Sequence, residues 1–338
     1  MDIVEILNQS LCQYVGSFTP LGCLTLLITC GSLIAAVVLF ALWKYKEGPR
    51  YYKTNRIDGK VVVITGCNTG IGKETALELA RRGARIYMAC RDYNRCEKAR
   101  QEIIYETGNN KIFNRRLDLS SLESVREFAE QFKRDEQRLD ILINNAGIMA
   151  TPRKLTTEGY EQQFAVNHLG HFLLTNLLLD HLKAAVPSRI IVVSSWMYAL
   201  GRIQTEDINS EKSYNDFRAY AQSKLANVLF SHKLSQMLKG SGITVNCLHP
   251  GSVQTELFRN NRFLAISSQL TKLALRSARG GAQTTIYLAL DPDLEGKTGG
   301  YYDRMKLQKL VAKACDNEMA DWLWQKSAEM VGLKINGE

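Results

Sequence analysis

The sequence lacks several features that would place the chain in a class at once. Its eight cysteines contain no CxxC pair and no zinc-ligand spacing, which argues against a structural metal. Its net charge of +9 does not come from runs of Lys or Arg, because acids are interspersed along most of the chain, and this argues against nucleic-acid binding. We find no internal repeat and no low-complexity segment. With these classes set aside, the composition is that of an ordinary globular protein.

Long apolar runs are also scarce, and only residues 21–43 can cross a bilayer as one helix. Before this run the only charged side chains are Asp2 and Glu5. Residues 44–60 hold an excess of positive charge, from Lys44, Lys46, Arg50, Lys53, Arg56 and Lys60 against Glu47 and Asp58. The positive-inside rule therefore predicts that residues 1–20 are luminal and that the large domain faces the cytosol.

A cleaved signal peptide is the alternative for this segment, but the basic n-region, short apolar stretch and small-residue cleavage site are missing. We therefore predict a transmembrane anchor over residues 21–43, a basic linker over residues 44–57 and one catalytic domain over residues 58–338. In a cytosolic domain we expect the cysteines to be reduced.

Beyond the linker, apolar runs of strand length alternate with segments of helix length. The predicted strands are residues 61–66, 85–90, 111–117, 139–147, 189–195 and 243–249. Such alternation predicts an α/β fold of Rossmann type, with a doubly wound parallel sheet. Residues 196–219 and 252–279 depart from the regular spacing, and both follow the carboxyl end of a strand, where ligands bind in open sheets.

The segment TGCNTGIG, residues 65–72, joins the first predicted strand to the first predicted helix. Its glycines allow a tight turn and a close approach of the backbone to a pyrophosphate. The helix that follows presents free N–H groups and a partial positive charge to such an anion. The turn therefore predicts a dinucleotide site, although its spacing differs from GxGxxG.

A second pattern, YAQSK, places Tyr220 and Lys224 four residues apart and therefore on one face of a helix. A free tyrosine titrates at a pKa of about 10, too high for a good general base at neutral pH. A neighbouring ammonium group favours the phenolate, so we expect Lys224 to lower the pKa of Tyr220.

Together these motifs resemble the short-chain dehydrogenase/reductase superfamily, over residues 58–332. The resemblance rests on TGCNTGIG, on NNAG at residues 144–147, on YAQSK and on HPG at residues 249–251. It implies Tyr220 as the catalytic acid/base with Lys224 beside it, and Ser195 as the hydroxyl that binds the substrate oxygen, with Ser194 as the alternative. It also implies that Asn167 supports a water near the lysine. We expect the flanking His168 and His171 to pack in the helix.

The resemblance further implies a nicotinamide cofactor. Arg91 follows Cys90, where NAD-preferring relatives have an acid, and an arginine there can pair with a 2′-phosphate, so NADP(H) is expected. The resemblance implies that Asp118, after the third predicted strand, contacts the adenine of the cofactor; the alternative is that it caps the following helix. The other implied cofactor contacts are Gly66, Asn68, Thr69, Gly70, Ile71, Gly72, Asn145, Ala146, Gly147, Tyr220, Lys224, Pro250, Gly251, Val253 and Thr255.

Four segments resemble the sequences of the retinol dehydrogenase group: VNHLGHFLLTNLLL, SRIIVVSS, SKLANVLF and TVNCLHPG. That group implies reduction of retinal or other lipophilic carbonyls at the endoplasmic reticulum, and relatives often form homodimers. Residues 258–276 have a lid-like composition suited to substrate choice or membrane contact, or they form an ordinary helix pair. The alternatives are a reductase of steroids, quinones or lipid-derived aldehydes, and a catalytically silent NADP(H)-binding membrane scaffold.

Overall fold

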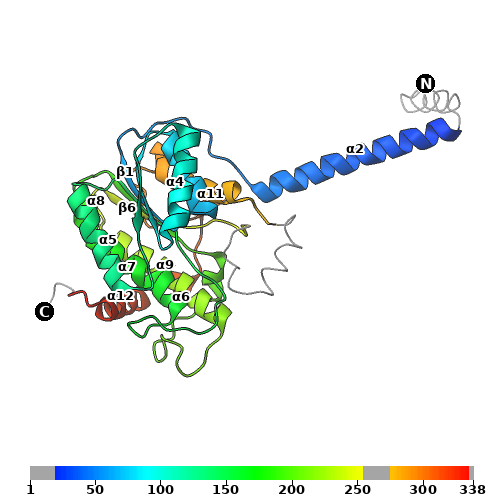
Figure 1. Ribbon diagram of the computed structural model, residues 1–338. Coiled ribbons are helices and arrows are strands. Elements are labelled where there is room, and N and C mark those ends of the chain that lie inside the picture. Colours follow the sequence, from blue (N-terminus) through cyan, green and yellow to red (C-terminus); the bar gives the residue numbers. More distant parts are fainter. Residues whose placement is uncertain (1–19, 254–274, 335–338) are drawn as a thin grey trace. The chain divides into compact units, whose positions relative to one another are not determined.

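The computed structural model describes residues 20–253 and 275–334 (Figure 1). The chain divides into two compact units, Met1–Gly48 and Pro49–Glu338. We consider each unit by itself, and every residue of the candidate site belongs to the second.

The first unit contains helix α2, which runs without a break over Pro20–Glu47 and has Lys44 and Lys46 in its last turn. Several apolar side chains on it are exposed: Ile28, Leu33, Ile34, Val37, Val38 and Phe40. Among the residues that the structure describes, no helix is both long enough and apolar enough to cross a membrane. The predicted transmembrane anchor over residues 21–43 is therefore not confirmed.

The second unit is built on one sheet, whose strand order over the described residues is β3-β2-β1-β4-β5-β6-β7-β8. Its strands are β1 Val61–Thr65, β2 Arg85–Cys90, β3 Ile112–Arg116, β4 Ile141–Asn144, β5 Ser188–Val193, β6 Ile243–His249, β7 Tyr301–Asp303 and β8 Lys306–Gln308. β8 alone pairs antiparallel, with β7. The predicted α/β class and the parallel sheet of the first six strands are confirmed.

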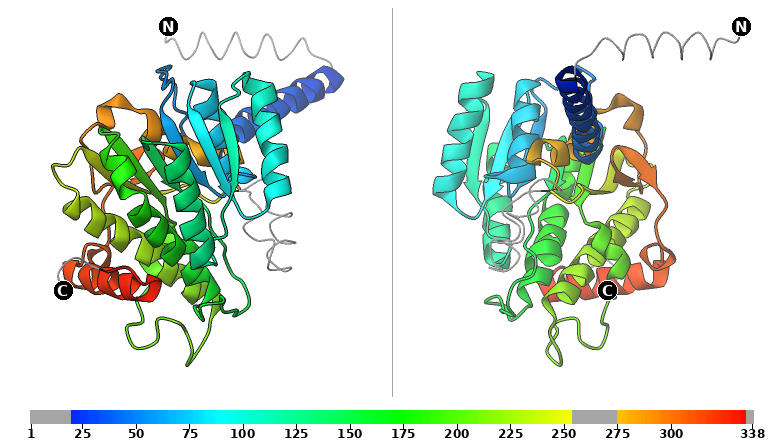
Figure 2. Two further views of the ribbon diagram at one scale, coloured as in Figure 1. Left: turned by 60° about the vertical axis from the view of Figure 1, so that its left-hand side comes forward. Right: turned by 90° about the vertical axis from the view of Figure 1, so that its right-hand side faces the viewer.

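Helices cover both faces of this sheet, as the views in Figure 2 show. One layer consists of α3 Gly70–Arg81, α4 Tyr93–Thr107 and α11 Ala278–Leu290. The other consists of α5 Leu122–Asp135, α7 Gly170–Leu177, α9 Asp216–Met237 and α12 Asn317–Val331. Shorter elements are α6 Gln162–Phe164, η1 Ala165–Leu169, α8 Leu179–Lys183, η2 Trp196–Leu200, η4 Pro292–Leu294 and η5 Ala312–Ala314.

Strand β1 shows why the sequences of these strands are continuous apolar runs. Val61 and Val63 belong to the hydrophobic core on the α9 side, whereas Val62 and Ile64 belong to the core on the α3 side. Because successive side chains of a strand point to opposite faces, a strand covered by helices on both faces needs apolar residues at every position.

The segment that follows Gly48 packs onto this fold. The Tyr51 amide donates to Gln283 of α11, and Arg82 at the end of α3 donates to the carbonyl oxygen of Asn55 over 2.9 Å. Lys53 forms ion pairs with Asp291 and Asp293. The second half of the predicted 44–57 linker thus lies against the α3–α11 side of the catalytic unit.

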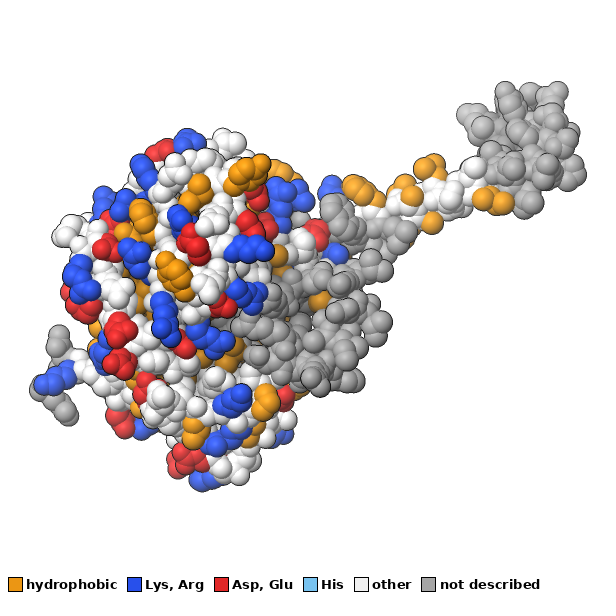
Figure 3. Space-filling view, in the orientation of Figure 1, with side chains coloured by type: hydrophobic (Ala, Val, Ile, Leu, Met, Phe, Trp, Pro, Cys, Tyr) orange, Lys and Arg blue, Asp and Glu red, His pale blue; other side chains and the backbone are white. Residues whose placement is uncertain are grey.

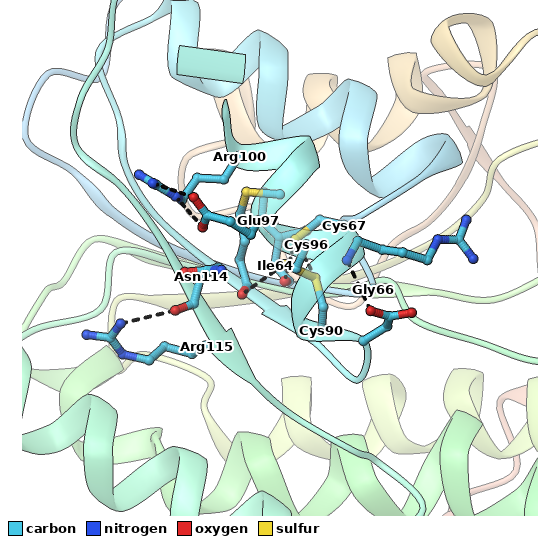
Figure 4. The surroundings of a disulfide bond; sticks show 12 residues. Ile64, Gly66, Cys67, Cys90, Cys96, Glu97, Arg100, Asn114 and Arg115 are labelled. Atoms are coloured by element: carbon cyan, nitrogen blue, oxygen red, sulfur yellow. Dashed lines mark hydrogen bonds and ion pairs between the residues drawn. A yellow bond between two sulfur atoms is a disulfide. The ribbon is translucent and has the colours of Figure 1, made fainter. Parts of the chain in front are cut away.

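A disulfide joins Cys90, the last residue of β2, to Cys96 in the first turn of α4 (Figure 4). The prediction of a fully reduced domain is therefore wrong for this pair. The sequence did not reveal it because a turn between strand and helix, rather than a CxxC motif, brings the two Cα atoms to 6.1 Å, within disulfide range. Cys67, Cys247 and Cys315 are free.

Candidate active site

The glycine-rich turn leaves β1 and enters α3 by a path that side chains would block. Gly66 has a positive φ of 64°, and a Cβ there would lie 2.8 Å from the Cβ of Ala146. A Cβ on Gly72 would lie 2.5 Å from the carbonyl oxygen of Gly66. Thr69, the N-cap of α3, makes no side-chain cap hydrogen bond, and the first turn of the helix has no acid. The N-terminus of α3 is therefore suited to an anion from outside the chain.

The NNAG segment locks onto this turn. The Asn145 side chain donates to the carbonyl oxygens of Thr65 at 2.8 Å and of Gly66 at 3.2 Å. The backbone amides of Asn145 and Ala146 both donate to the Thr65 hydroxyl at 2.9 Å. These bonds fix the ends of β1 and β4 against each other, which keeps the turn close to the sheet.

A cavity of about 370 Å³ runs along the carboxyl ends of the strands. Most of the predicted cofactor residues line it: Gly66, Asn68, Thr69, Gly70, Ile71, Gly72, Arg91, Asp118, Asn145, Ala146, Gly147, Tyr220, Lys224 and Pro250. Gly251 and Val253 are not part of its lining, and Thr255 lies outside the described residues. Most of the predicted 258–276 lid also lies outside them.

At one end of the cavity, Arg91 and Asp118 follow β2 and β3. Asp118 accepts from the amide and the hydroxyl of Ser120, at 3.0 and 2.6 Å. The N-cap of α5 is Ser121, so Asp118 is not the residue that caps this helix. Asp92 and Arg95 line the same end and were not predicted. The sequence alone does not show that Arg91 and Arg95 face one cavity. This follows only from the structure, in which α4 begins at Tyr93 between them.

Tyr220 and Lys224 lie on α9, as the four-residue spacing predicts, and both are buried. The Lys224 ammonium is 5.5 Å from the centre of the Tyr220 ring and donates to the carbonyl oxygen of Val193 at 3.3 Å. Burial raises the pKa of Tyr220 to about 12, and the neighbouring Ser195 hydroxyl acts against this rise. Burial lowers the pKa of Lys224 to about 8. The pKa of Tyr220 is thus raised and not lowered, contrary to the expectation, because burial of the phenol is the largest effect on it.

The two serines after β5 have different surroundings. The Ser194 hydroxyl donates to the carbonyl oxygen of Lys224 at 2.8 Å and is therefore engaged in holding α9 to the sheet. The Ser195 hydroxyl accepts from the Met197 amide at 3.3 Å and is close enough to the Tyr220 phenol to lower its pKa. Of the two hydroxyls, that of Ser195 is the one beside the phenol.

Asn167 lies in η1, a single π-helical turn between α6 and α7, and turns of this kind often occur at functional sites. Its side-chain oxygen accepts from the Ile148 amide at 2.8 Å. Its side-chain nitrogen donates to the Ile148 carbonyl oxygen and to the Ser223 hydroxyl, both at 2.9 Å. Asn167 thus connects the segment after β4 to α9.

His171 extends this network. The Thr65 hydroxyl lies 2.9 Å from His171 Nε2 and already accepts from two backbone amides, so its own proton goes to Nε2. The proton of the ring must then be on Nδ1, which donates to the carbonyl oxygen of Asn167 at 3.0 Å. His171 therefore does more than pack: it links the β1–α3 turn to the π-helical turn.

Of the predicted irregular segment 196–219, only residues 201–215 are irregular, because η2 takes up residues 196–200 and α9 begins at Asp216. Side chains outside it bind its backbone: Gln222 accepts from the Gln204 amide at 2.8 Å and donates to the Ile208 carbonyl oxygen at 3.0 Å. Arg153 donates to the carbonyl oxygen of Ser210 at 2.9 Å. The path of the segment is thus fixed at several points.

Comparison with known proteins assigns the family. The family model described as "short chain dehydrogenase" matches residues 60–263. Retinol dehydrogenase 13 of Homo sapiens is 48% identical over 311 residues, 90% of this chain and 93% of that protein. Retinol dehydrogenase 12 of Mus musculus is 47% identical over 279 residues, 82% of this chain and 88% of that protein.

The chain belongs to the short-chain dehydrogenase family. Its resemblance to the retinol dehydrogenase branch is confirmed, and it is an oxidoreductase that acts on CH–OH groups. Among solved structures, an uncharacterised protein from Mycobacterium paratuberculosis is 36% identical, with a TM-score of 0.69. The match covers 85% of this chain and 98% of that one.

The residues of this short-chain dehydrogenase fit the nicotinamide cofactor that the family implies. The uncapped start of α3 and the close backbone at Gly66 suit a pyrophosphate. The cavity continues from there to Tyr220 and Lys224. Within the described residues no group of three or more His, Cys, Asp or Glu side chains could hold a metal ion.

The buried histidines of this short-chain dehydrogenase predict sensitivity to acid. Burial lowers the pKa of His168 to about 3 and that of His171 to about 4, from an ordinary 6.5. Below pH 6.5 the unfolded chain takes up protons that the folded one does not. The free energy of unfolding is therefore at its full value above pH 6.5 and falls towards pH 4, by about 1.4 kcal/mol per pH unit for each ring.

Urea titrations of the full-length protein in detergent at several pH values measure this slope. His171→Gln should lower stability at pH 7 and remove one ring's share of the slope. Because carboxylates also titrate in this range, the difference between the wild-type and variant slopes is the diagnostic quantity. Equal slopes would mean that His171 is charged in the folded protein.

Proposed function

We propose that this protein is a membrane-anchored, NADP(H)-dependent oxidoreductase that interconverts retinal and retinol. The observation that carries the proposal is that Tyr220 and Lys224 line the cavity that begins at the glycine-rich turn, with Ser195 beside the Tyr220 phenol. The retinoid assignment draws on the relatives, which include proteins named retinol dehydrogenase 13 and retinol dehydrogenase 12.

In the reductive direction, the Tyr220 hydroxyl donates its proton to the substrate oxygen. A phenol whose pKa is about 12 keeps this proton at neutral pH until negative charge develops on that oxygen. When bound, the nicotinamide supplies the hydride. The Ser195 hydroxyl donates a hydrogen bond to the same oxygen and thereby orients the carbonyl group.

Lys224 supports the phenolate that this proton transfer leaves behind. With a pKa of about 8 its ammonium group carries a positive charge at neutral pH, and it lies 5.5 Å from the Tyr220 ring centre. In a desolvated site such a charge acts strongly. Asn167 positions this pair by connecting Ile148 to Ser223, which lies between Tyr220 and Lys224 on α9.

NADP(H) is proposed as the cofactor because β2 ends in Cys90 rather than in an acid that would receive the ribose hydroxyls, and Arg91, which follows it, lines the cavity. An arginine at this position pairs with a 2′-phosphate through charge-assisted hydrogen bonds.

The membrane assignment is supported by the sequence of α2 and by its exposed side chains. Residues 21–43 carry no charge, and the described part of the helix exposes Leu33, Val37 and Phe40. Retinoids dissolve in bilayers, so an anchored enzyme meets its substrate there. We propose the endoplasmic reticulum membrane with the catalytic domain in the cytosol. Pairing of two copies stays a prediction.

The first test is activity of membranes that contain the chain, assayed with NADPH against all-trans-retinal, a steroid ketone, a quinone and a medium-chain aldehyde. We expect the highest kcat/KM with retinal. Tyr220→Phe should bind cofactor but lose about 10²- to 10⁴-fold in turnover, because the ring remains while the proton is gone.

Tyr105→Phe, at a tyrosine that is 91% exposed, is the matched control and should retain full activity. Retention of more than about a tenth of the activity by Tyr220→Phe would remove the assigned acid. Preference for another member of the panel would replace retinal by that class of substrate.

A second prediction concerns Arg91. Arg91→Ala should raise the KM for NADPH by about ten- to a hundredfold, the value of one charge-assisted contact, and change that for NADH much less. Arg81→Ala, at the end of α3 and outside the cavity lining, is the control. Equal effects on both cofactors would exclude a contact with the 2′-phosphate.

The third prediction concerns topology. In sealed microsomes, added protease should destroy the catalytic domain and spare the anchor, because the excess of Lys and Arg follows residues 21–43. Survival of residues 60–338 until detergent is added would show a luminal domain. Extraction of the intact chain by alkaline carbonate would instead argue against a transmembrane anchor.

A further inference from the structure

The disulfide Cys90–Cys96 closes a short loop that carries one end of the cofactor cavity. Between the two cysteines the chain leaves β2 and enters α4, and Arg91, Asp92 and Arg95 from this loop all line the cavity. All three are exposed, whereas Cys90 and Cys96 are buried. The charged side chains thus lie on the cavity side of the loop, and the sulfur atoms lie on its buried side.

The two ends of the loop are fixed by different parts of the fold. The Cys90 carbonyl oxygen accepts from the Leu117 amide at 2.9 Å, which ties it to the end of β3. Cys96 belongs to the hydrophobic core beneath α4, together with Ala99 and Ile103. The disulfide connects these two supports, so it ties the first turn of α4 to the end of the sheet.

The charges on the loop show why one arginine is not enough. Asp92 is the N-cap of α4 and accepts from the Arg95 amide at 3.0 Å, so its carboxylate is held at the cavity end. A phosphate monoester carries about −1.5 to −2 charges at neutral pH. Asp118 lies at the same end, so Arg91 alone would leave a net charge of −1 there, whereas Arg91 and Arg95 together balance the two acids.

We propose that Arg95 is a second cationic ligand of the cofactor's 2′-phosphate and that the Cys90–Cys96 bond positions it, so that affinity for NADPH depends on the oxidation state of this cysteine pair. The inference rests on the proposed NADP(H) specificity. Oxidised protein binds NADPH more tightly than reduced protein, and NADH, which has no 2′-phosphate, is bound equally by both.

The redox step is thiol–disulfide exchange with a low-molecular-weight thiol. One thiolate attacks a sulfur of the disulfide, a mixed disulfide forms, and the displaced cysteine takes up a proton. A second thiol then breaks the mixed disulfide. The two small thiols lose two electrons and become one small disulfide, while Cys90 and Cys96 become thiols; oxidation by a small disulfide is the reverse.

A third sulfur lies close to this pair. Cys67 Sγ is 3.9 Å from Cys90 Sγ, and Cys67 belongs to the glycine-rich turn (Figure 4). Burial raises the pKa of Cys67 to about 12, so it stays a thiol and does not attack the disulfide. Because Cys90 and Cys96 are buried as well, an external thiol reaches them only when the loop opens.

The test measures dissociation constants for NADPH and NADH by protein fluorescence, with the full-length protein in detergent. The samples are oxidised wild type, wild type reduced by a dithiol, Cys96→Ala and Arg95→Gln, with thiols counted by mass spectrometry. Lys98→Gln removes a charge from the same helix outside the cavity, and Cys315→Ala removes an exposed free thiol; both are controls.

We expect Arg95→Gln to weaken NADPH binding about tenfold, as loss of a charge-assisted contact does. Reduction or Cys96→Ala should weaken it about fivefold, roughly the cost of re-ordering one loop residue. NADH binding should change less than twofold throughout. By linkage, saturating NADPH should raise the ratio of disulfide to dithiol in a glutathione buffer by the same factor.

If oxidised wild type binds NADPH no better than NADH, the proposed cofactor specificity fails. If wild type prefers NADPH but neither reduction nor Cys96→Ala changes that preference, the positioning role of the disulfide is overturned. An Arg95→Gln variant equal to Lys98→Gln overturns the second ligand. Should Cys96→Ala fail to fold, reduced wild type decides the question, and thiols that resist oxidation by oxidised glutathione also overturn the proposal.

Discussion

The hydroxyl group of Thr65 joins three parts of the molecule that are far apart in the sequence. It accepts from the amides of Asn145 and Ala146 after β4 and donates to His171, whose other nitrogen holds the carbonyl oxygen of Asn167. Through these bonds the glycine-rich turn, the end of β4 and the π-helical turn keep one mutual arrangement. The geometry of the whole cavity depends on it, because each of these segments contributes to its wall or to the support of α9.

The parts of this fold that the sequence predicts are those encoded over short distances. Six strands follow from apolar runs, and the pairing of Tyr220 with Lys224 follows from the pitch of one helix. β7 and β8, of three residues each, are too short to give a periodic signal. β7 forms on the edge of β6, and β8 forms on β7, so both depend on pairing that no local sequence pattern indicates.

Contacts between distant segments could not be predicted from the sequence, because no local pattern encodes them. The tautomer of His171 depends on what Thr65 accepts from another strand, and the disulfide depends on how tightly the chain turns from β2 into α4. Burial, too, is a property of the whole fold. It raises the pKa of Tyr220 and lowers that of Lys224, so the balance between the two groups differs from the one that their spacing alone suggested.

The segment 201–215 is held at its backbone by Gln222 and Arg153, which lie outside it, and through its own buried Ile203 and Ile208. The side chains of Asn209 and Tyr214 also bind residues outside it. Hydrogen bonds to main-chain atoms are indifferent to the side chain at the residue that they hold. Substitutions at its exposed positions, such as Arg202, Glu206 and Lys212, can therefore change the polarity that it presents without changing its course. Such an arrangement separates the positions that fix the path of the chain from those that are free to vary, so related chains can differ at the latter while they share one framework.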